Sequence, residues 1–504
     1  MTYRLLTLLI LFTLLSTVCC SSAPKPPPSQ AELAQLSGVW KGAIELPGKK
    51  LFIRLRFRYV HSEWRGSMDI RAQSLLDHPL SNIDYRGSVV SFELDGVPGF
   101  PRFSGRLEGD QIRGDFSQSR HTFPFKVKVL KRTFKAASTE ALADQSAQPQ
   151  ERIKDAKSTR RPQHPKPPFP YRSEEVTYRS QNHSLVGTLT LPSSPPPYVA
   201  MLLISGSGPQ DRDSTLMGHK PFLVLADHLT RAGIAVLRVD DRGVGKSTGV
   251  FTDATTKDFA SDALAGISYL VSRPEIDPDH IGVIGHSEGG SVALLAAQQS
   301  KTVSRVILLG APAMTGAETA QHQYKLILKA KGAPEAEVDK LLAFNQQILD
   351  LIKSSETKAI YQSNVVRFVD TYFETLSPED QVKAKSKEQM VKALMSSAQL
   401  FKWKRFYLRY DPRDAIRALA VPTLVLNGER DTQVDPRLNL PIMRRELAKA
   451  PTKDVTVKML KGLNHLFQTS ETGQVDEYAQ IEETMNSAVL TLISTWIKSR
   501  IASE

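Results

Sequence analysis

The amino-acid sequence predicts a small all-β barrel or sandwich followed by a larger α/β domain, in which a mostly parallel sheet is covered by helices. Three observations lead to this prediction. The chain has 504 residues, more than one compact domain usually holds. Short runs of alternating polar and apolar residues fill the region 36–131. Beyond residue 171, continuous apolar runs alternate with amphipathic helical patterns, which is typical of a parallel sheet buried on both faces.

The first 20 residues have the layout of an export signal. Arg4 precedes an apolar run at 5–18 that is short for a membrane span, and small residues follow. The only cysteines of the chain, Cys19 and Cys20, lie at its end. We expect export to the periplasm, the cell envelope or the outside of the cell. The segment is either simply cleaved or attached to the membrane by a lipid on one of these cysteines.

The absence of other cysteines limits the chemistry of the folded domains. It excludes disulfides, a cysteine nucleophile and cysteine-ligated zinc. The net charge of +12 is concentrated in part in the segment 151–166, which is also rich in Pro and Gln. Such a segment is typical of a solvated linker, and we predict no nucleic-acid partner.

The all-β domain is expected at 36–131, with turn residues between its strands. The expected strands are 38–46, 51–60, 86–94, 103–109, 111–117 and 123–130. Along 51–60 an apolar face alternates with a basic face. The basic face carries Arg54, Arg56 and Arg58. It could contact an anionic surface, but a solvated sheet face is the favoured interpretation. Residues 133–170 are then expected to form a flexible linker.

The α/β domain is expected at 171–504. Its strand-like apolar runs are 199–208, 234–243, 281–287, 303–312 and 422–431. The helical runs between them are 222–233, 258–272 and 291–299. Catalytic loops of such a sheet lie at the carboxyl ends of the strands. The helical stretch at about 315–410 interrupts the alternation, so we expect an inserted lid, with a peripheral helical decoration as the alternative.

The strongest chemical signal is the sequence Gly-His-Ser-Glu-Gly at 285–289, which follows a buried strand and opens a helix. A serine held at so sharp a turn needs small neighbours, and Gly285 and Gly289 provide that room. Ser287 is therefore the predicted nucleophile, exposed at the tip of the turn.

A serine hydroxyl needs a base, and the base needs an orienting acid. His465 is the predicted base, because it is the only histidine beyond Asp431. Asp431 is the favoured acid, since it comes just after a buried strand; Glu429 and Asp435 are its rivals. His286 adjoins the serine, but its side chain should leave the turn in another direction and support packing.

Two backbone amides should bind the oxyanion that forms during acyl transfer. One is the amide of Glu288, directly after the nucleophile. The other comes from the small-residue loop 205–209, where we favour Ser207 over Gly206. The charged residues at 211–213 of the same loop either bind a polar substrate group or, as we favour, brace the loop through ion pairs.

The letters GVGKS at 243–247 suggest a phosphate-binding loop. That loop has the form G-x-x-x-x-G-K-[ST] and needs glycine at position 240, where this chain has Asp240 beside Asp241. Two carboxylates would repel a polyphosphate. We therefore interpret the stretch as a turn after a sheet strand, braced by an ion pair between Asp241 and Arg242.

Taken together, the motifs SGSGPQDRD, DDRGVGKSTG, GHSEGG, NGERDTQV and GLNHLFQ resemble the secreted bacterial α/β-hydrolases of the serine esterase and S33/S9-like peptidase superfamily. The N-terminal pattern resembles the β-domain that precedes some of these hydrolases. The resemblance implies an α/β-hydrolase fold and a triad of Ser287, Asp431 and His465, the same three residues reached above.

The expected function is hydrolysis of a carboxylic ester, with a small-molecule ester or acyl substrate and no metal or organic cofactor. A peptidase or amidase using the same triad is the alternative. No group of acidic residues stands out that would hold the free amino terminus of a peptide. A third hypothesis is a hydrolase-like binding protein whose β-domain grips a cell-envelope polymer.

Overall fold

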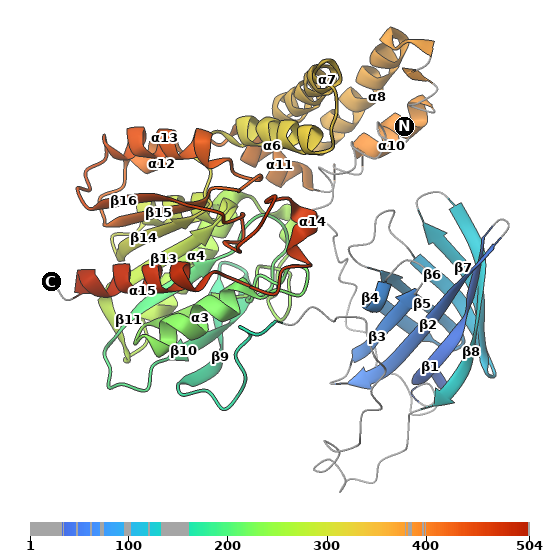
Figure 1. Cartoon of the computed structure of the whole chain (residues 1–504), viewed down its shortest axis with the longest axis horizontal. Coiled ribbons are helices and arrows are strands. Elements are labelled where there is room, and N and C mark those ends of the chain that lie inside the picture. The colour runs from blue at the N-terminus through green and yellow to red at the C-terminus, as the bar shows by residue number, and fades with distance from the viewer. Residues whose placement is uncertain are drawn as a thin grey trace, which may run out of the picture. The chain divides into compact units, whose positions relative to one another are not determined.

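The computed structural model describes residues 33, 35–46, 49–60, 63–70, 75–94, 102–118, 121–132, 161–378, 380–381, 386–395, 398 and 400–501 (Figure 1). The chain divides into two compact units, one within Thr17–Asp155 and the other mainly Ala156–Glu504. The expected signal segment, with Cys19 and Cys20, lies outside the described residues, as does the stretch 133–160. Within the described part of the chain, no helix has the length and apolar character needed to cross a bilayer.

The first unit is a closed barrel rather than a sandwich. Its strands are β1 (Gly38–Leu46), β2 (Lys49–Val60), β3 (Glu63–Ile70), β4 (Leu75–Arg86), β5 (Val89–Leu94), β6 (Arg102–Glu108), β7 (Gln111–Gln118) and β8 (His121–Arg132). Each strand pairs antiparallel with the next, and β1 pairs with β8, with Gly38 opposite Arg132. Closure satisfies the backbone groups that an open sheet would leave at its edges.

Large side chains fill the barrel. Trp40, Phe57, Phe92 and Phe103 are all fully buried there. On the outer face of β2, Arg56 pairs with Asp69 of β3 at 2.7 Å, so this arginine of the basic face has a partner within the barrel.

The second unit is built on an eight-stranded mixed sheet of order β16-β15-β14-β13-β11-β12-β10-β9. Its strands are β9 (Arg172–Ser180), β10 (His183–Leu191), β11 (Tyr198–Ile204), β12 (Ala235–Val239), β13 (Ile276–His286), β14 (Val303–Leu309), β15 (Thr423–Gly428) and β16 (Val455–Leu460). The strands from β11 onward are parallel, while β9 and β10 run antiparallel at one edge. The α/β-hydrolase fold predicted from the sequence is confirmed.

Helices cover both faces of this sheet (Figure 1). One face is covered by α4 (Thr256–Val271), α5 (Glu288–Gln299), α12 (Arg413–Arg417) and α13 (Pro436–Leu447). The other face is covered by α3 (Pro221–Arg231) and α15 (Ser487–Ile501). The 3-10 helix η3 (Phe251–Asp253) lies between β12 and α4, and the short helix α14 (Val475–Tyr478) lies between β16 and α15. The double cover explains why the parallel strands are continuously apolar.

Further helices lie between β14 and β15, where the sequence predicted an insertion. They are α6 (Gly316–Ala330), α7 (Glu335–Ser354), α8 (Lys358–Thr375), α10 (Lys387–Met395) and α11 (Phe401–Arg409). We call this region the helical insertion. It has an apolar core of its own, which includes Phe344, Tyr361 and Phe401.

The end of the expected flexible linker is anchored to the second unit. Arg161 donates to the carbonyls of Met217, Ala479 and Ile481 at 2.9–3.0 Å. Gln163 donates to the carbonyl of Met485 at 2.6 Å. The prediction of a flexible linker is therefore wrong for 161–163, because the side chains of Arg161 and Gln163 find backbone partners on the α/β unit.

Candidate active site

Ser287 lies at the strained turn between β13 and α5. Its φ of 56° is in the left-handed region, and its backbone N–H donates to the carbonyl of Leu309 at 2.9 Å. A Cβ at Gly285 would come within 2.2 Å of the Gly289 carbonyl oxygen, and one at Gly289 within 2.3 Å of the Ile204 carbonyl oxygen. Only glycine fits at both positions, so the steric argument for this turn is confirmed.

Asp431 and His465 form a buried pair. Nδ1 of His465 lies 2.7 Å from Oδ2 of Asp431. The same oxygen accepts from the side chain of Asn427 at 3.0 Å, and Oδ1 accepts from the backbone N–H groups of Gln433 and Val434 at 2.9 and 2.8 Å. Asn427, Gln433 and Val434 thus hold the Asp431 side chain in place, with Oδ2 facing Nδ1 of His465.

The backbone at Leu309 and Gly310 joins this pair to the serine turn. Leu309 accepts the N–H of Ser287, and Gly310 follows with a φ of 56°. A Cβ at Gly310 would lie 3.2 Å from Nδ1 of His465 and 3.3 Å from Oδ2 of Asp431. The structure thus brings the three residues of the predicted triad to the same edge of the sheet.

The rival residues have other partners. Glu429 accepts the backbone N–H of Gly462 at 2.9 Å, and Asp435 caps α13 and contacts His322 at 3.0 Å. His286 places Nε2 3.0 Å from the carbonyl oxygen of His465, and the two rings are 4.7 Å apart between centroids. Burial, together with the charge of the neighbouring histidine, lowers the pKa of His286 to about 3. His286 therefore stays neutral and supports the backbone of His465.

The small-residue loop lies against the serine turn. A Cβ at Gly206 would be 3.1 Å from Cβ of Ser287. The hydroxyl of Ser207 donates to Oε2 of Glu288 at 2.7 Å. Both backbone amides expected to bind the oxyanion, those of Glu288 and of Ser207 or Gly206, belong to segments in contact at this point.

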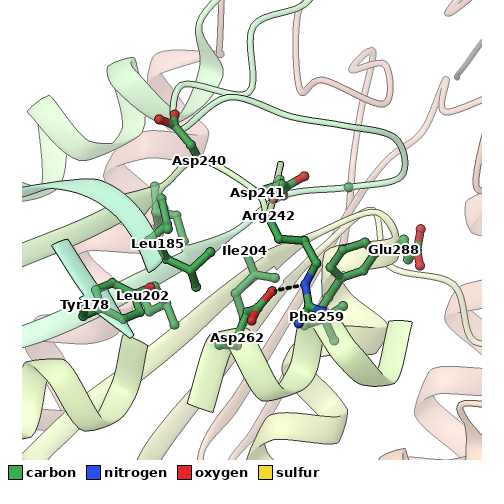
Figure 2. A pocket seen from close by; sticks show the side chains of 16 residues that line it. Tyr178, Leu185, Leu202, Ile204, Asp240, Asp241, Arg242, Phe259, Asp262 and Glu288 are labelled. Atoms are coloured by element: carbon green, nitrogen blue, oxygen red, sulfur yellow. Dashed lines mark hydrogen bonds and ion pairs between the residues drawn. The ribbon is translucent and has the colours of Figure 1, made fainter. Parts of the chain in front are cut away.

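The predicted ion pair between Asp241 and Arg242 is wrong. Asp241 instead accepts the Ser205 hydroxyl at 2.8 Å and the backbone N–H of Gln210 at 2.9 Å, which holds both ends of the small-residue loop. Arg242 donates to Asp262 at 2.7 Å (Figure 2). Side chains of adjacent residues leave the chain in different directions, so each finds its own buried partner. Burial raises the pKa of Asp241 to about 7.

Residues of the small-residue loop also line the cavity drawn in Figure 2. Gly206, Asp241 and Glu288 are among the residues that line it. Its volume is about 60 Å³. Ligand pockets usually measure about 300–1,000 Å³, so this cavity is too small for a substrate.

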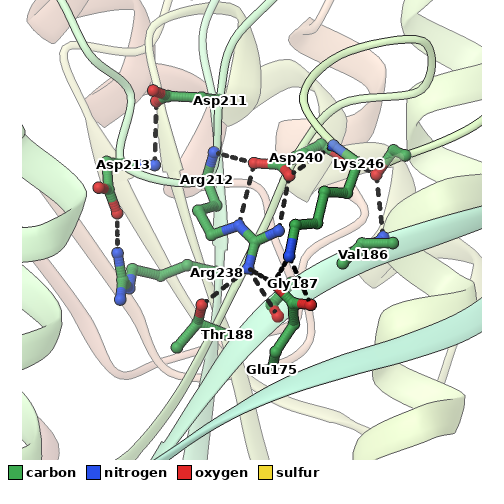
Figure 3. Close-up of polar contacts among 11 residues, drawn as sticks. Glu175, Val186, Gly187, Thr188, Asp211, Arg212, Asp213, Arg238, Asp240 and Lys246 are labelled. Carbon is green, nitrogen blue, oxygen red and sulfur yellow. Dashed lines mark hydrogen bonds and ion pairs between the residues drawn. The ribbon is translucent and has the colours of Figure 1, made fainter. Parts of the chain in front are cut away.

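Carboxylates of the protein itself form hydrogen bonds and ion pairs with the GVGKS stretch (Figure 3). Asp240 accepts the backbone N–H of Lys246 at 3.2 Å and forms a two-pronged contact with Arg212 at 3.0 and 2.7 Å. The Lys246 ammonium pairs with Glu175 at 2.8 Å. The N–H and the ammonium that would hold a phosphate are therefore already in use, which argues against a nucleotide site.

The charged residues at 211–213 brace their loop, as favoured from the sequence. Besides the contact of Arg212 with Asp240, Asp213 pairs with Arg238 (Figure 3). Asp213 also pairs with Lys220, at 3.0 Å. The ion pairs reach outside the loop and so hold it to β12 and to the start of α3.

Two contacts of the site were not predicted. Oε1 of Glu288 accepts the hydroxyl of Thr256 at 2.7 Å and the indole N–H of Trp403 at 2.8 Å. Thr256 follows the capping box at Thr255, so the helix start was recognisable, but its partner was not. No local pattern marks Trp403, because its contact depends on where tertiary packing places α11 relative to α4 and α5.

A larger cavity of about 900 Å³ adjoins these contacts. Thr255, Phe401, Lys402 and Arg405 are among its lining residues, so α11 and the start of α4 both border it. Its size is in the range of small-molecule sites. Among the described residues, no three His, Cys, Asp or Glu side chains are grouped so that they could hold a metal ion.

Two curated proteins are similar in sequence to parts of this chain. The curated esterase EstD of Thermotoga maritima is 25% identical over 316 residues, which cover 62% of this chain and 66% of EstD. Human dipeptidyl peptidase 8 is 34% identical over 122 residues, which cover 23% of this chain and 13% of that protein. The chain thus spans less than two thirds of the length of either relative.

Among solved structures, the Pyrococcus furiosus esterase Pf2001 covers 65% of this chain with 91% of its own, at 16% identity and a TM-score of 0.39. The α/β hydrolase GrgF from Penicillium sp. sh18 covers 66% of this chain with 99% of its own, at 16% identity and a TM-score of 0.41.

A protein-family model described as serine aminopeptidase, S33 (Hydrolase_4) matches residues 220–472, half of the chain. The matched residues contain the serine turn and the buried pair of Asp431 and His465. The chain belongs to this S33 family of α/β-hydrolases.

Proposed function

We propose that the chain is a serine hydrolase that cleaves carboxylic esters through an acyl-enzyme on Ser287. One observation carries the proposal: the 2.7 Å hydrogen bond between His465 and Asp431 lies beside the strained turn that presents Ser287. A positioned serine, an imidazole and a buried acidic side chain are the parts that nucleophilic acyl transfer requires.

In the proposed reaction, Oγ of Ser287 attacks the ester carbonyl carbon, and Nε2 of His465 takes the hydroxyl proton. Asp431 orients the imidazole and stabilises its charged form. The backbone N–H groups of Glu288 and Ser207 donate to the oxyanion. The tetrahedral intermediate collapses, and the alcohol leaves with the proton from His465. Water then attacks the acyl-enzyme with His465 as base, releasing the acid and restoring the serine.

A peptidase or amidase on the same triad is the second candidate, favoured by the family's description as a serine aminopeptidase. We favour esters because the similarity to EstD extends over 316 residues, against 122 for the dipeptidyl peptidase. The helical insertion would act as a lid, since Trp403 of α11 donates to Glu288, the residue directly after the nucleophile.

The test uses purified Ser287→Ala and a matched control, Ser268→Ala, which removes an exposed hydroxyl on α4. Turnover of short-chain p-nitrophenyl esters and labelling by a fluorophosphonate should disappear only in Ser287→Ala. Unchanged turnover in that variant would refute the assignment. Faster cleavage of aminoacyl anilides than of esters with the same acyl group would favour the peptidase.

We also propose that the protein is exported and works in the cell envelope, with a lipid on Cys19 or Cys20 or with simple cleavage of the signal. The layout of residues 1–20 supports this proposal. Mass spectrometry of the mature N-terminus distinguishes the two outcomes, and an intact Met1 would contradict both.

A further inference from the structure

The side chain of Glu288 is the meeting point of three segments that are distant in sequence. It is nearly inaccessible, with 3% of its surface exposed. Its carboxyl group accepts from Ser207 in the loop after β11, from Thr256 at the start of α4 and from Trp403 in α11, all at 2.7–2.8 Å. A buried carboxyl group with three short contacts is costly to assemble, and breaking one of them leaves a polar group unsatisfied.

The first contact fixes the middle of the loop that carries the proposed oxyanion donor. Asp241 holds the two ends of this loop through Ser205 and Gln210. The Ser207 hydroxyl donates to Glu288 at 2.7 Å, whereas the side chain of Gln210, at the end of the same loop, donates to the Ser207 carbonyl at 3.3 Å. Glu288 therefore holds the middle of the loop from outside it, and Glu288 itself directly follows the nucleophile.

The third contact ties the helical insertion to the same carboxyl group. Trp403 stacks on Tyr407 of the same helix, with the ring centroids 5.3 Å apart. The backbone of Tyr407 packs so closely on α6 that a Cβ at Gly316 would come within 2.0 Å of the Tyr407 carbonyl oxygen. The indole N–H thus belongs to a closely packed part of the insertion. A movement of α11 would therefore displace or break the hydrogen bond to the Glu288 side chain.

The electrostatic setting suits a group next to a developing negative charge. Burial raises the pKa of Glu288 above that of a free carboxyl, whereas its three hydrogen-bond donors act in the opposite direction. Because three donors converge on this group, a hydrogen-bonding amide of the same shape should be able to replace it.

We propose that the Glu288 side chain is a positioning residue, which holds the loop bearing the Ser207 amide in its catalytic place and links that place to the position of α11. The proposal rests on the proposed serine-hydrolase function and adds a role that the triad does not contain. It differs from simple space filling, because it requires hydrogen bonds to both Ser207 and Trp403.

The experiment measures kcat and KM on a short-chain p-nitrophenyl ester for Glu288→Gln and Glu288→Ala. In the glutamine variant, Oε1 can still accept from Thr256 and Trp403, and Nε2 can donate to the Ser207 hydroxyl. We expect Glu288→Gln to keep kcat within about fivefold of the wild type. Glu288→Ala should lose about 100-fold in kcat with KM changed much less, because a displacement of about 1 Å at a catalytic group costs that much.

A double-mutant cycle tests the link itself. Ser207→Ala and Trp403→Phe remove one donor each and leave the carboxyl group in place. If Glu288 couples them, the double variant loses less kcat than the product of the two single losses. Independent, multiplicative losses would overturn the link even if Glu288→Ala failed to fold.

The outcomes separate this proposal from the function on which it rests. Full turnover by Ser287→Ala would refute the serine mechanism. An inactive Ser287→Ala together with wild-type kcat in Glu288→Ala would refute only the positioning role. Equal losses in the glutamine and alanine variants would also refute it, because the hydrogen bonds kept by glutamine would then have no effect.

Discussion

Replacing His286 with glutamine should change how the stability of the α/β unit depends on pH. His286 is buried beside His465, and burial lowers its pKa from 6.5 to about 3. The folded protein therefore does not take up a proton here until the pH falls to about 3, whereas the unfolded chain takes one up near 6.5. The stabilising contribution of the neutral ring is present above pH 6.5 and is lost as the pH falls toward 3.

The size of the effect follows from the two pKa values. Each unit of difference corresponds to about 1.4 kcal/mol, so the free energy of unfolding should fall by about 2 kcal/mol between pH 7.5 and pH 5. At pH 3 the loss reaches about 4 kcal/mol. Glutamine does not titrate, and its amide N–H can still reach the His465 carbonyl that His286 contacts at 3.0 Å.

The assay is urea denaturation of the wild type and His286→Gln at both pH values, followed by circular dichroism and tryptophan fluorescence. At pH 7.5 the free energies of unfolding of the two proteins should differ only by the pH-independent cost of replacing the imidazole ring. At pH 5 the free energy of unfolding of the variant, relative to that of the wild type, should be about 2 kcal/mol higher than at pH 7.5. The same difference at both pH values would refute the argument that His286 stays neutral in the folded protein.

Three further substitutions and one titration test other parts of the structure. Asp431→Asn keeps the size of the acid but not its charge, so kcat on a p-nitrophenyl ester should fall about 10³–10⁴-fold, and near-normal activity would exclude Asp431 as the acid. Gly285→Ala places a methyl group 2.2 Å from the Gly289 carbonyl oxygen and should destabilise the protein by about 3 kcal/mol; an unchanged melting temperature would contradict this. Arg212→Lys keeps the charge but breaks the two-pronged contact with Asp240, which should lower the urea midpoint by the equivalent of about 1–2 kcal/mol. Isothermal titration with ATP should give no micromolar binding, and such binding would restore the phosphate-loop hypothesis.

The serine turn was predictable because its geometry depends on residues next to each other in sequence. A strand, two glycines around the serine and a following helix leave one conformation that avoids the steric clashes. Asp431 and His465 were predictable for a related reason: carboxyl ends of parallel strands meet at one edge, so chain order and strand position select the partners.

Contacts that depend on tertiary packing were not predictable. Asp241 and Arg242 are adjacent and opposite in charge, yet they turn to different neighbours. The contact between Trp403 and Glu288 spans an insertion whose placement no local pattern encodes. The architecture of the all-β domain was not predictable for the same reason. Alternating strands are compatible with both a barrel and a sandwich, and only the pairing of the first strand with the last distinguishes the two.

The closure of the barrel also sets an order of events for the growing chain. All strand pairs of the barrel except one join strands that are neighbours along the sequence. Each of these pairs can form its hydrogen bonds as soon as both strands have left the ribosome. The pairing of β1 with β8, which sets Gly38 opposite Arg132, must wait until almost the whole domain has been made. Until then, the ladder edge of β1 is open to other partners, including the same strand of another nascent chain. The last strand of the domain is therefore the one that protects the first.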